Sequence, residues 1–229
     1  MATETDLAAD RGPRTAGGPG GPYDPTAGRT AEAAAWHSEG ARSIADPGPL
    51  GLSAFALTTF LLSLVNAKVI PAGTEPVVFG LALAYGGIGQ FAAGMWEFRK
   101  GNTFGATAFA SFGAFWISFW ALVTFYAKDL GGAAGSAVGW YLIAWGIFTT
   151  LMFLASLRTS AAVCLVFLLL SATFYFLGFG EWTTQVWVGK TGGWLGIATA
   201  GAAWYAALAS VSASTFGRQV LPNPPLAGR

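Results

Sequence analysis

Charge, cysteine and histidine are all scarce in this sequence, and each scarcity excludes a class of protein. Only 10% of the 229 residues are charged and the net charge is +1, whereas soluble domains carry about 25% charged residues and nucleic-acid-binding domains need a basic face. The one cysteine, Cys164, excludes a disulfide framework and a cysteine-based zinc cluster. The one histidine, His37, lies in a polar region. We therefore expect no enzymatic activity, no metal, no cofactor and no nucleic-acid partner.

Residues 1–45 differ in composition from the rest of the chain. They are rich in glycine, proline, alanine and threonine, as in the run 17–22, and they mix acidic side chains with arginines. Such a segment cannot bury enough apolar surface to offset the entropy that it would lose on ordering. The composition therefore predicts a disordered Gly/Pro/Ala-rich tail.

Long apolar runs, separated by short polar breaks, begin at Leu50. Crossing a hydrocarbon core of about 30 Å takes about 20 helical residues, whereas barrel strands alternate polar and apolar residues over about ten positions. The runs long enough for helices are 50–67, 76–96, 103–126, 137–157, 160–180 and 192–213. The sequence predicts an all-α integral membrane protein with a six-helix transmembrane bundle over 46–215 and a short C-terminal tail over 216–229.

The basic residues near the predicted helix ends are distributed unequally. If both termini lie on one side, that side holds Arg42, Arg99, Lys100, Arg158, Arg218 and Arg229, and the other holds Lys68, Lys128 and Lys190. Basic residues favour the cytoplasmic side of a membrane. The distribution predicts that both termini, and both tails, are cytoplasmic. The expected location of the protein is the cytoplasmic (inner) membrane.

The middles of the predicted helices contain hydroxyl, amide and aromatic side chains but no charged residue. Ionisable residues at this depth usually mark proton relays and ion-coupling sites, whereas hydroxyl and amide groups can replace part of a small solute's hydration shell. A serine or threonine hydroxyl also often bonds a carbonyl of its own helix. As candidates for hydrogen bonds to a solute we select Thr58, Tyr85, Gln90 and Ser111.

Several segments resemble one family of membrane proteins. Residues 46–52 read Asp-Pro-Gly-Pro-Leu-Gly-Leu, similar to the Asn-Pro-Ala-Pro-Leu-Gly-Leu signature of the acetate uptake transporter family, which includes the succinate–acetate permeases. The resemblance continues through 85–90, 97–105, 108–116, 145–149 and 216–222, in the right order. The signature residues that match or replace those of the family are Asp46, Pro47, Pro49, Leu50, Gly51 and Leu52.

The resemblance implies a homohexamer in which each protomer has its own pore, narrowed by Phe55, Phe112 and Leu170. Phe112 stands where the family often has tyrosine, so the constriction lacks a hydroxyl. Asp46 replaces the asparagine of the signature, and if unpaired it would repel anions from the cytoplasmic mouth. Ala203 falls at a small position that the family associates with selectivity, which is consistent with short monocarboxylates as solutes.

The function predicted from these features is transport of acetate and other short monocarboxylates across a lipid bilayer. The residues leave open whether the protein is a channel or a proton symporter. Two alternatives remain. The charge-free interior also suits a channel for neutral solutes such as urea or ammonia, and a membrane protein that senses acetate through its tail would need no transport.

Overall fold

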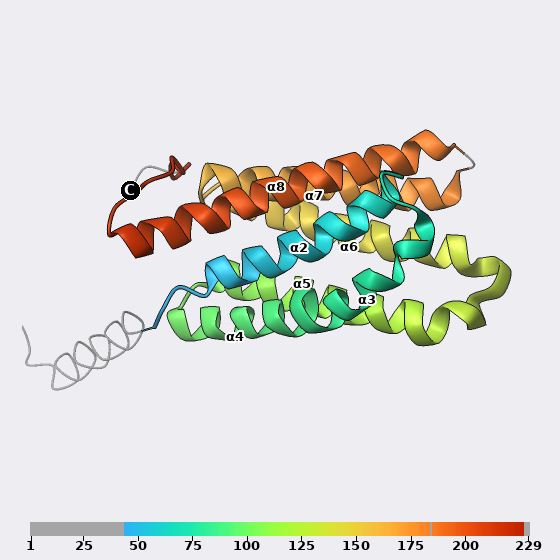
Figure 1. Cartoon of the computed structure of the whole chain (residues 1–229), viewed down its shortest axis with the longest axis horizontal. Helices are drawn as coiled ribbons and strands as arrows, with labels where there is room; N and C mark the ends of the chain where they lie inside the picture. Colours follow the sequence, from blue (N-terminus) through green and yellow to red (C-terminus); the bar gives the residue numbers. More distant parts are fainter. Residues whose placement is uncertain (1–43, 184, 227–229) are drawn as a thin grey trace, which may run out of the picture. The chain divides into compact units, whose positions relative to one another are not determined.

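The described part of the chain is a bundle of long apolar helices (Figure 1). A computed structural model describes residues 44–183 and 185–226. Within them, five helical stretches are long and apolar enough to cross a membrane: Gly48–Asn66, Ala72–Lys100, Thr103–Ser156, Ala161–Trp182 and Val186–Phe216. Nearly all of the tail predicted over 1–45 lies outside the described residues.

Helix α2 (Gly48–Asn66) begins two residues earlier than the sequence predicts. Pro49 occupies an early position of the first turn, where the missing N–H of proline breaks no helical hydrogen bond. The side chain of Asp46 accepts a hydrogen bond of 3.1 Å from the N–H of Gly48. One of the unpaired donors at the start of the helix is thereby satisfied.

The second apolar run is not a uniform helix. It consists of α3 (Pro76–Leu83), a π-helical stretch η2 (Ala84–Gly89) and α4 (Gln90–Lys100), and it ends at Gly101, whose φ of 79° suits glycine. Gly86 allows η2 to approach α2 closely, because a Cβ at this position would lie 2.6 Å from Thr58 Oγ1. The sequence predicted a helix over 76–96 and missed both the π-helical stretch and the last turn.

The third stretch contains two helices that run in opposite directions (Figure 1). Helix α5 (Thr103–Ala121) is capped by Asn102 and continues into a π-helical turn, η3 (Leu122–Tyr126), and a 3₁₀ segment, η4 (Ala127–Ala133). Gly131 leaves helical geometry there, with φ 50° and ψ −128°, and α6 (Ala134–Ser156) follows. The single 54-residue stretch thus contains the third and fourth predicted helices.

The last two helices are α7 (Ala161–Trp182) and α8 (Val186–Phe216). Helix α8 extends beyond the predicted run 192–213 at both ends. The residues after it return to the start of α7, where the N–H of Ala161 donates to Pro224 O (3.0 Å) and the N–H of Ala162 donates to Asn223 Oδ1 (3.2 Å). The segment after α8 therefore helps to cap α7.

Helix α8 packs against α2 and α7, α6 packs against α7, and α4 packs against α5. Small residues make the closest approaches possible: a Cβ at Gly193 would collide with the backbone of Ala67, and one at Gly94 with the backbone of Ala110. These small residues serve contacts within one chain. The start of α2, the end of α4, the α6–α7 turn and the end of α8 lie at one end of the bundle (Figure 1).

Candidate functional site

A cavity of about 270 Å³ opens between the helices toward the loops at the other end of the bundle. Its walls come from α2, α5, η3, α6 and α7, together with Glu75 immediately before α3, and α8 contributes no lining residue. The lining residues are Phe55, Thr59, Leu62, Ser63, Asn66, Glu75, Phe115, Trp116, Phe119, Leu122, Val123, Val138, Tyr141, Leu142, Leu170, Thr173, Phe174, Leu177 and Glu181.

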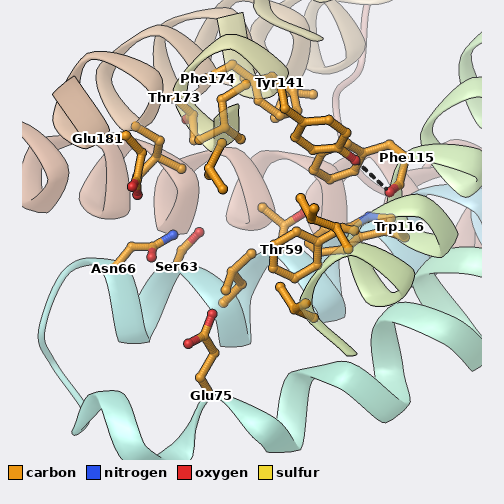
Figure 2. Close-up of a pocket in the computed structure, with 18 of the residues that line it drawn as sticks. Thr59, Ser63, Asn66, Glu75, Phe115, Trp116, Tyr141, Thr173, Phe174 and Glu181 are labelled. Atoms are coloured by element: carbon orange, nitrogen blue, oxygen red, sulfur yellow. Dashed lines mark hydrogen bonds between the residues drawn. The ribbon is translucent and has the colours of Figure 1, made fainter. Parts of the chain in front are cut away.

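One end of this cavity is polar. Ser63, Asn66, Glu75 and Glu181 gather there from three separate segments (Figure 2). Asn66 and Glu181 also line an adjoining cavity of about 240 Å³, together with Lys68 and Lys190. The polar end of the larger cavity therefore carries two carboxyl groups, and the adjoining cavity adds two lysine side chains. It leads toward the loops, where water has access.

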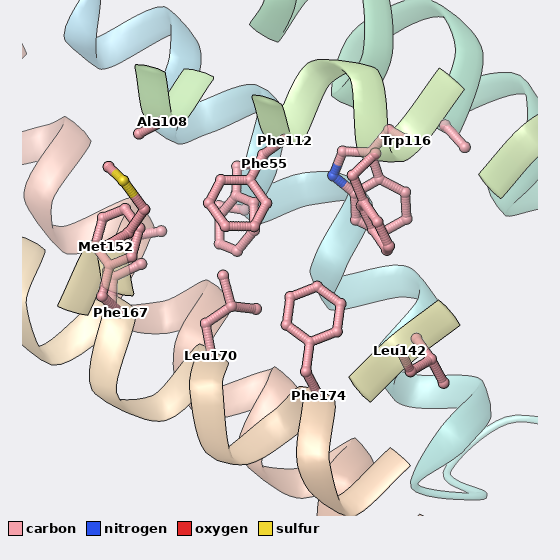
Figure 3. Packing of buried hydrophobic residues seen from close by; sticks show 14 residues of the cluster. Phe55, Ala108, Phe112, Trp116, Leu142, Met152, Phe167, Leu170 and Phe174 are labelled. Atoms are coloured by element: carbon pink, nitrogen blue, oxygen red, sulfur yellow. The ribbon is translucent and has the colours of Figure 1, made fainter. Parts of the chain in front are cut away.

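The opposite end of the cavity closes on Phe55 and Leu170. The two side chains are 5% and 3% exposed, and both line a second, much smaller cavity of about 20 Å³. Phe55 and Leu170 therefore form a boundary between the two cavities. Figure 3 shows both side chains within the buried hydrophobic cluster. The small cavity is completed by Leu52, Gln90, Ala108, Phe109, Phe112, Val166 and Phe167.

Phe112 lies on the small-cavity side of this boundary and at the centre of a cluster of aromatic rings. Its ring centroid is 6.0 Å from that of Phe55, which brings α5 against α2. The other neighbouring rings are Trp145, Phe148, Phe167 and Phe174, at 5.6–6.4 Å. The three residues that the sequence selected for a constriction, Phe55, Phe112 and Leu170, are thus brought together.

Three buried polar atoms near this boundary lack a hydrogen-bond partner among the described residues: Thr59 Oγ1, Gln90 Oε1 and Trp116 Nε1. Their side chains are 5%, 1% and 2% exposed. Thr59 and Trp116 line the larger cavity, and Gln90 lines the smaller one. Because burying an unpaired polar group is costly, a set of three beside these cavities indicates that water or a bound solute satisfies them.

The other candidates from the sequence lie elsewhere. The hydroxyl of Thr58 bonds Ala54 O of its own helix (3.0 Å) and faces Gly86, and neither Thr58 nor Tyr85 lines the two cavities. Ser111 lines an open groove between α5 and α6. Ala203 is fully buried on α8 within the hydrophobic core.

The signature residues assemble the start of α2. A Cβ at Gly51 would lie 2.6 Å from the ring of Phe109, so this glycine lets α2 meet α5. Leu52 reaches the small cavity, Pro47 is buried and Leu50 is exposed. Asp46 is paired with Lys100 (2.7 Å), so the unpaired anion considered from the sequence does not occur.

Thr59 and Trp116 were not selected from the sequence, although a signal for Thr59 was present. Phe55, Thr59, Ser63 and Asn66 are spaced by four, four and three residues, which places them on one face of α2. Thr58 is one position out of this spacing. No comparable pattern marks Trp116, because aromatic residues occupy several faces of α5.

The sequence has clear relatives. The pattern of the GPR1/FUN34/yaaH family matches residues 28–227. Ammonia transport outward protein 2 of Saccharomyces cerevisiae is 41% identical over 174 residues, which are 73% of this chain and 62% of that protein. The succinate-acetate/proton symporter SatP of Escherichia coli is 36% identical over 184 residues, which are 80% of this chain and 97% of that protein.

A solved structure of the bacterial acetate channel SatP is also similar, with a TM-score of 0.75 and 36% identity over 80% of this chain and 100% of that chain. The shared helical fold and the apolar stretches identify the protein as an all-α integral membrane protein that crosses the bilayer several times. The family match covers most of the sequence and confirms the resemblance carried by residues 46–52. The chain therefore belongs to the GPR1/FUN34/yaaH family.

Proposed function

We propose that this protein moves acetate and other short monocarboxylates across the cytoplasmic membrane, through a constriction formed by Phe55, Phe112 and Leu170. The observation that carries the proposal is that Phe55 and Leu170 line both the larger and the smaller cavity. A side chain shared by two cavities on one path is where passage is controlled. An apolar ring at such a place can gate by excluding water.

Transport, rather than catalysis, is supported by the names of the relatives. One is a succinate-acetate/proton symporter and another an acetate channel. The cavity volume of about 270 Å³ is near the lower end of small-molecule sites, about 300–1,000 Å³, which suits a solute of a few heavy atoms. Lys68 and Lys190 in the adjoining cavity offer positive charge to an arriving anion, next to the carboxyl groups of Glu75 and Glu181.

The proposed protomer has six membrane crossings over 46–215, with the 1–45 and 216–229 tails in the cytoplasm. The reversal at Gly131 within the longest apolar stretch supports the sixth crossing. Lys100 is the last residue of α4, and Arg158 and Arg218 follow α6 and α8, all at one end of the bundle, as expected for a cytoplasmic side. A homohexamer of such protomers is proposed from the family resemblance.

The test is acetate flux into liposomes that contain the purified protein, compared with empty liposomes. Leu170→Ala should widen the constriction and raise the flux of propionate or butyrate relative to acetate. Leu168→Ala is the matched control, because Leu168 lies on the same helix but is 49% exposed and lines neither cavity. If the two variants showed the same selectivity between solutes, Leu170 would not be part of the constriction. Absence of acetate flux from the folded wild type would reject transport of acetate.

Ammonia is a second candidate solute, because a relative that is 41% identical is named an ammonia transport outward protein. The same liposomes can be tested with ammonium gradients and a pH-sensitive dye. Two observations together would favour ammonia as the solute: ammonia flux that acetate and propionate do not inhibit, and no flux of acetate.

A further inference from the structure

The cavity of about 240 Å³ that adjoins the polar end of the larger one is lined by charged side chains from separate segments. Lys68 follows the end of α2, and Lys190 lies in α8. Asn66 and Glu181 line both cavities, so the two spaces meet at these residues. We refer to the 240 Å³ space as the mouth cavity, because it lies where the loop after α2 meets the turn between α7 and α8.

The backbone of Lys68 has a conformation that disfavours lysine. Its φ is 57°, and among the described residues it is the only one other than glycine with a positive φ. The turn ends α2, because the N–H of Lys68 donates to Val65 O (2.9 Å) and that of Val69 donates to Leu64 O (2.9 Å). Glycine is the usual residue at this position, since it has no Cβ. Lys68 therefore occupies the turn at a cost in stability, and its side chain lines the mouth cavity.

The charges around the mouth cavity favour one bound negative charge. Lys68 and Lys190 supply two positive charges at neutral pH, Glu181 supplies one negative charge, and no other lining residue is charged. Both lysines are exposed, and neither is in an ion pair with another residue that the structure describes. The lining thus has a net charge of one positive unit, which a single carboxylate group balances.

A second carboxylate group on the same solute would meet charges of its own sign. Glu181 lies at the junction of the two cavities, and Glu75 lines the larger one. Figure 2 shows their carboxyl groups directed toward the space beside Asn66. A dicarboxylate held at the lysines would extend its other end toward these two acids, which repel it. A monocarboxylate would instead extend an alkyl tail toward Leu177, which lines both cavities.

We propose that the mouth cavity is an entry site that binds one carboxylate group with Lys68 and Lys190, and that Glu181 makes this site selective for monocarboxylates over dicarboxylates. The lysines attract the anion from water. Glu181 repels solutes with a second negative charge before they reach the larger cavity. This assignment rests on the proposed transport function and adds where the solute first binds and which residue limits its charge.

Three solutes of similar length but different charge test the site. Succinate carries two negative charges at neutral pH, whereas monomethyl succinate and butyrate each carry one. For the wild type in liposomes, after subtraction of the leak into empty liposomes, we expect butyrate and monomethyl succinate to inhibit acetate uptake. Succinate should inhibit about fivefold more weakly, the effect of one screened contact between like charges. Added salt should reduce this difference, because the charges are exposed.

Glu181→Gln keeps the approximate shape of the side chain and removes its charge. We expect succinate to inhibit this variant about as strongly as monomethyl succinate does, with acetate uptake retained. Asp129→Asn is the control, because Asp129 is an exposed acid in η4 that lines neither cavity. The control should keep the wild-type difference between succinate and its monomethyl ester.

Lys68→Gly removes the ammonium group and introduces the residue that the left-handed turn favours. We expect the acetate concentration for half-maximal uptake to rise about fivefold, while the midpoint of thermal unfolding rises. Weaker uptake by a more stable protein could not be attributed to misfolding. Lys128→Gln is the control, because Lys128 is exposed in η4 and lines neither cavity, and its half-maximal concentration should not change.

Three results would overturn the assignment while leaving acetate transport intact. They are inhibition of the wild type by succinate as strong as that by its monomethyl ester at low salt, a folded Glu181→Gln variant that still excludes succinate, and an unchanged half-maximal concentration in Lys68→Gly. If Glu181→Gln does not fold, the wild-type comparison and Lys68→Gly still decide. Absence of any acetate flux from the folded wild type would instead reject the proposed function, and this assignment with it.

Discussion

Asp46 Oδ1 lies 2.7 Å from Lys100 Nζ and so ties the residue two positions before α2 to the last residue of α4. The same oxygen accepts the N–H of Gly48. The side chain therefore has two separate roles, as an ion-pair partner and as an acceptor at the start of a helix. The family signature has asparagine here, which can fill only the second role.

Substitution of Asp46 should separate these two roles. The ion pair is partly exposed, at 33% and 46% for its side chains, so Asp46→Asn should change the free energy of unfolding by less than about 1 kcal/mol. Asp46→Ala also removes the acceptor for Gly48 and should cost about 1 kcal/mol more. Thermal unfolding in detergent at low and high salt measures both. A larger loss in Asp46→Asn than in Asp46→Ala would contradict this division.

Glu97 is 1% exposed although the sequence placed it in a polar break. Its Oε2 accepts from Asn102 Nδ2 (2.8 Å), and Asn102 Oδ1 accepts from the N–H of Gly105 (3.1 Å), so the acid holds the residue that caps α5. We expect Glu97→Ala to destabilise the protein by about 2–4 kcal/mol, because it leaves a cavity and a stranded donor.

Glu97→Gln is the matched comparison, since its amide oxygen can still accept from Asn102. It should cost about 1 kcal/mol, the typical net value of a hydrogen bond. Thermal unfolding of the two variants measures the difference. Equal losses would mean that the charge of Glu97, and not its contact with Asn102, stabilises this turn.

Phe112 offers a test of how polarity at the constriction sets the solute. Phe112→Tyr restores the hydroxyl that the family resemblance implies, within a ring cluster where the phenylalanine is 3% exposed. A buried hydroxyl without a partner costs about 1–3 kcal/mol, so water or solute should enter to satisfy it. We expect the ratio of succinate flux to acetate flux to rise in liposomes. An unchanged ratio at normal stability would show that polarity at Phe112 does not select the solute.

The helices could be predicted because each apolar run is longer than a soluble core helix needs and ends at charged, proline or glycine residues. The π-helical stretch over Ala84–Gly89 could not be predicted. It allows Gly86 to meet Thr58, and that contact joins two segments distant in sequence. The cap that Asn223 provides for α7 also joins two segments distant in sequence. It could not be predicted, because nothing within α7 indicates which residue caps it.

Which face of each helix points inward was harder to predict than the helices themselves. In a soluble helix the apolar stripe marks the core, but lipid-facing residues are as apolar as buried ones, as Leu168 and Leu170 illustrate. The family resemblance supplied Phe55, Phe112 and Leu170, which the structure brings together. The resemblance marked no hydroxyl, and only the spacing of Phe55, Thr59 and Ser63 along α2 pointed to Thr59, which lines the cavity, rather than to its neighbour Thr58.

Two glycines of α8 should respond in opposite directions to the same substitution. A Cβ at Gly193 would collide with the backbone of Ala67, whose N–H donates to Ser63 O (2.8 Å) at the end of α2. A Cβ at Gly201 would meet nothing within 4 Å. Gly193→Ala should therefore push α8 away from α2 and destabilise the protein by about 1–3 kcal/mol. Gly201→Ala should stabilise it by about 0.5–1 kcal/mol through helix propensity.

Thermal unfolding of both variants in the same detergent provides the measurement. Because the two variants share a helix and a chemical change, any general effect of added apolar volume on detergent binding cancels between them. If Gly193→Ala were as stable as Gly201→Ala, the close approach of α8 to the end of α2 would not be required for the packing of this bundle. Acetate flux of Gly193→Ala should also fall, because α2 carries both Phe55 and Thr59 and its displacement would separate them from Leu170 and Trp116.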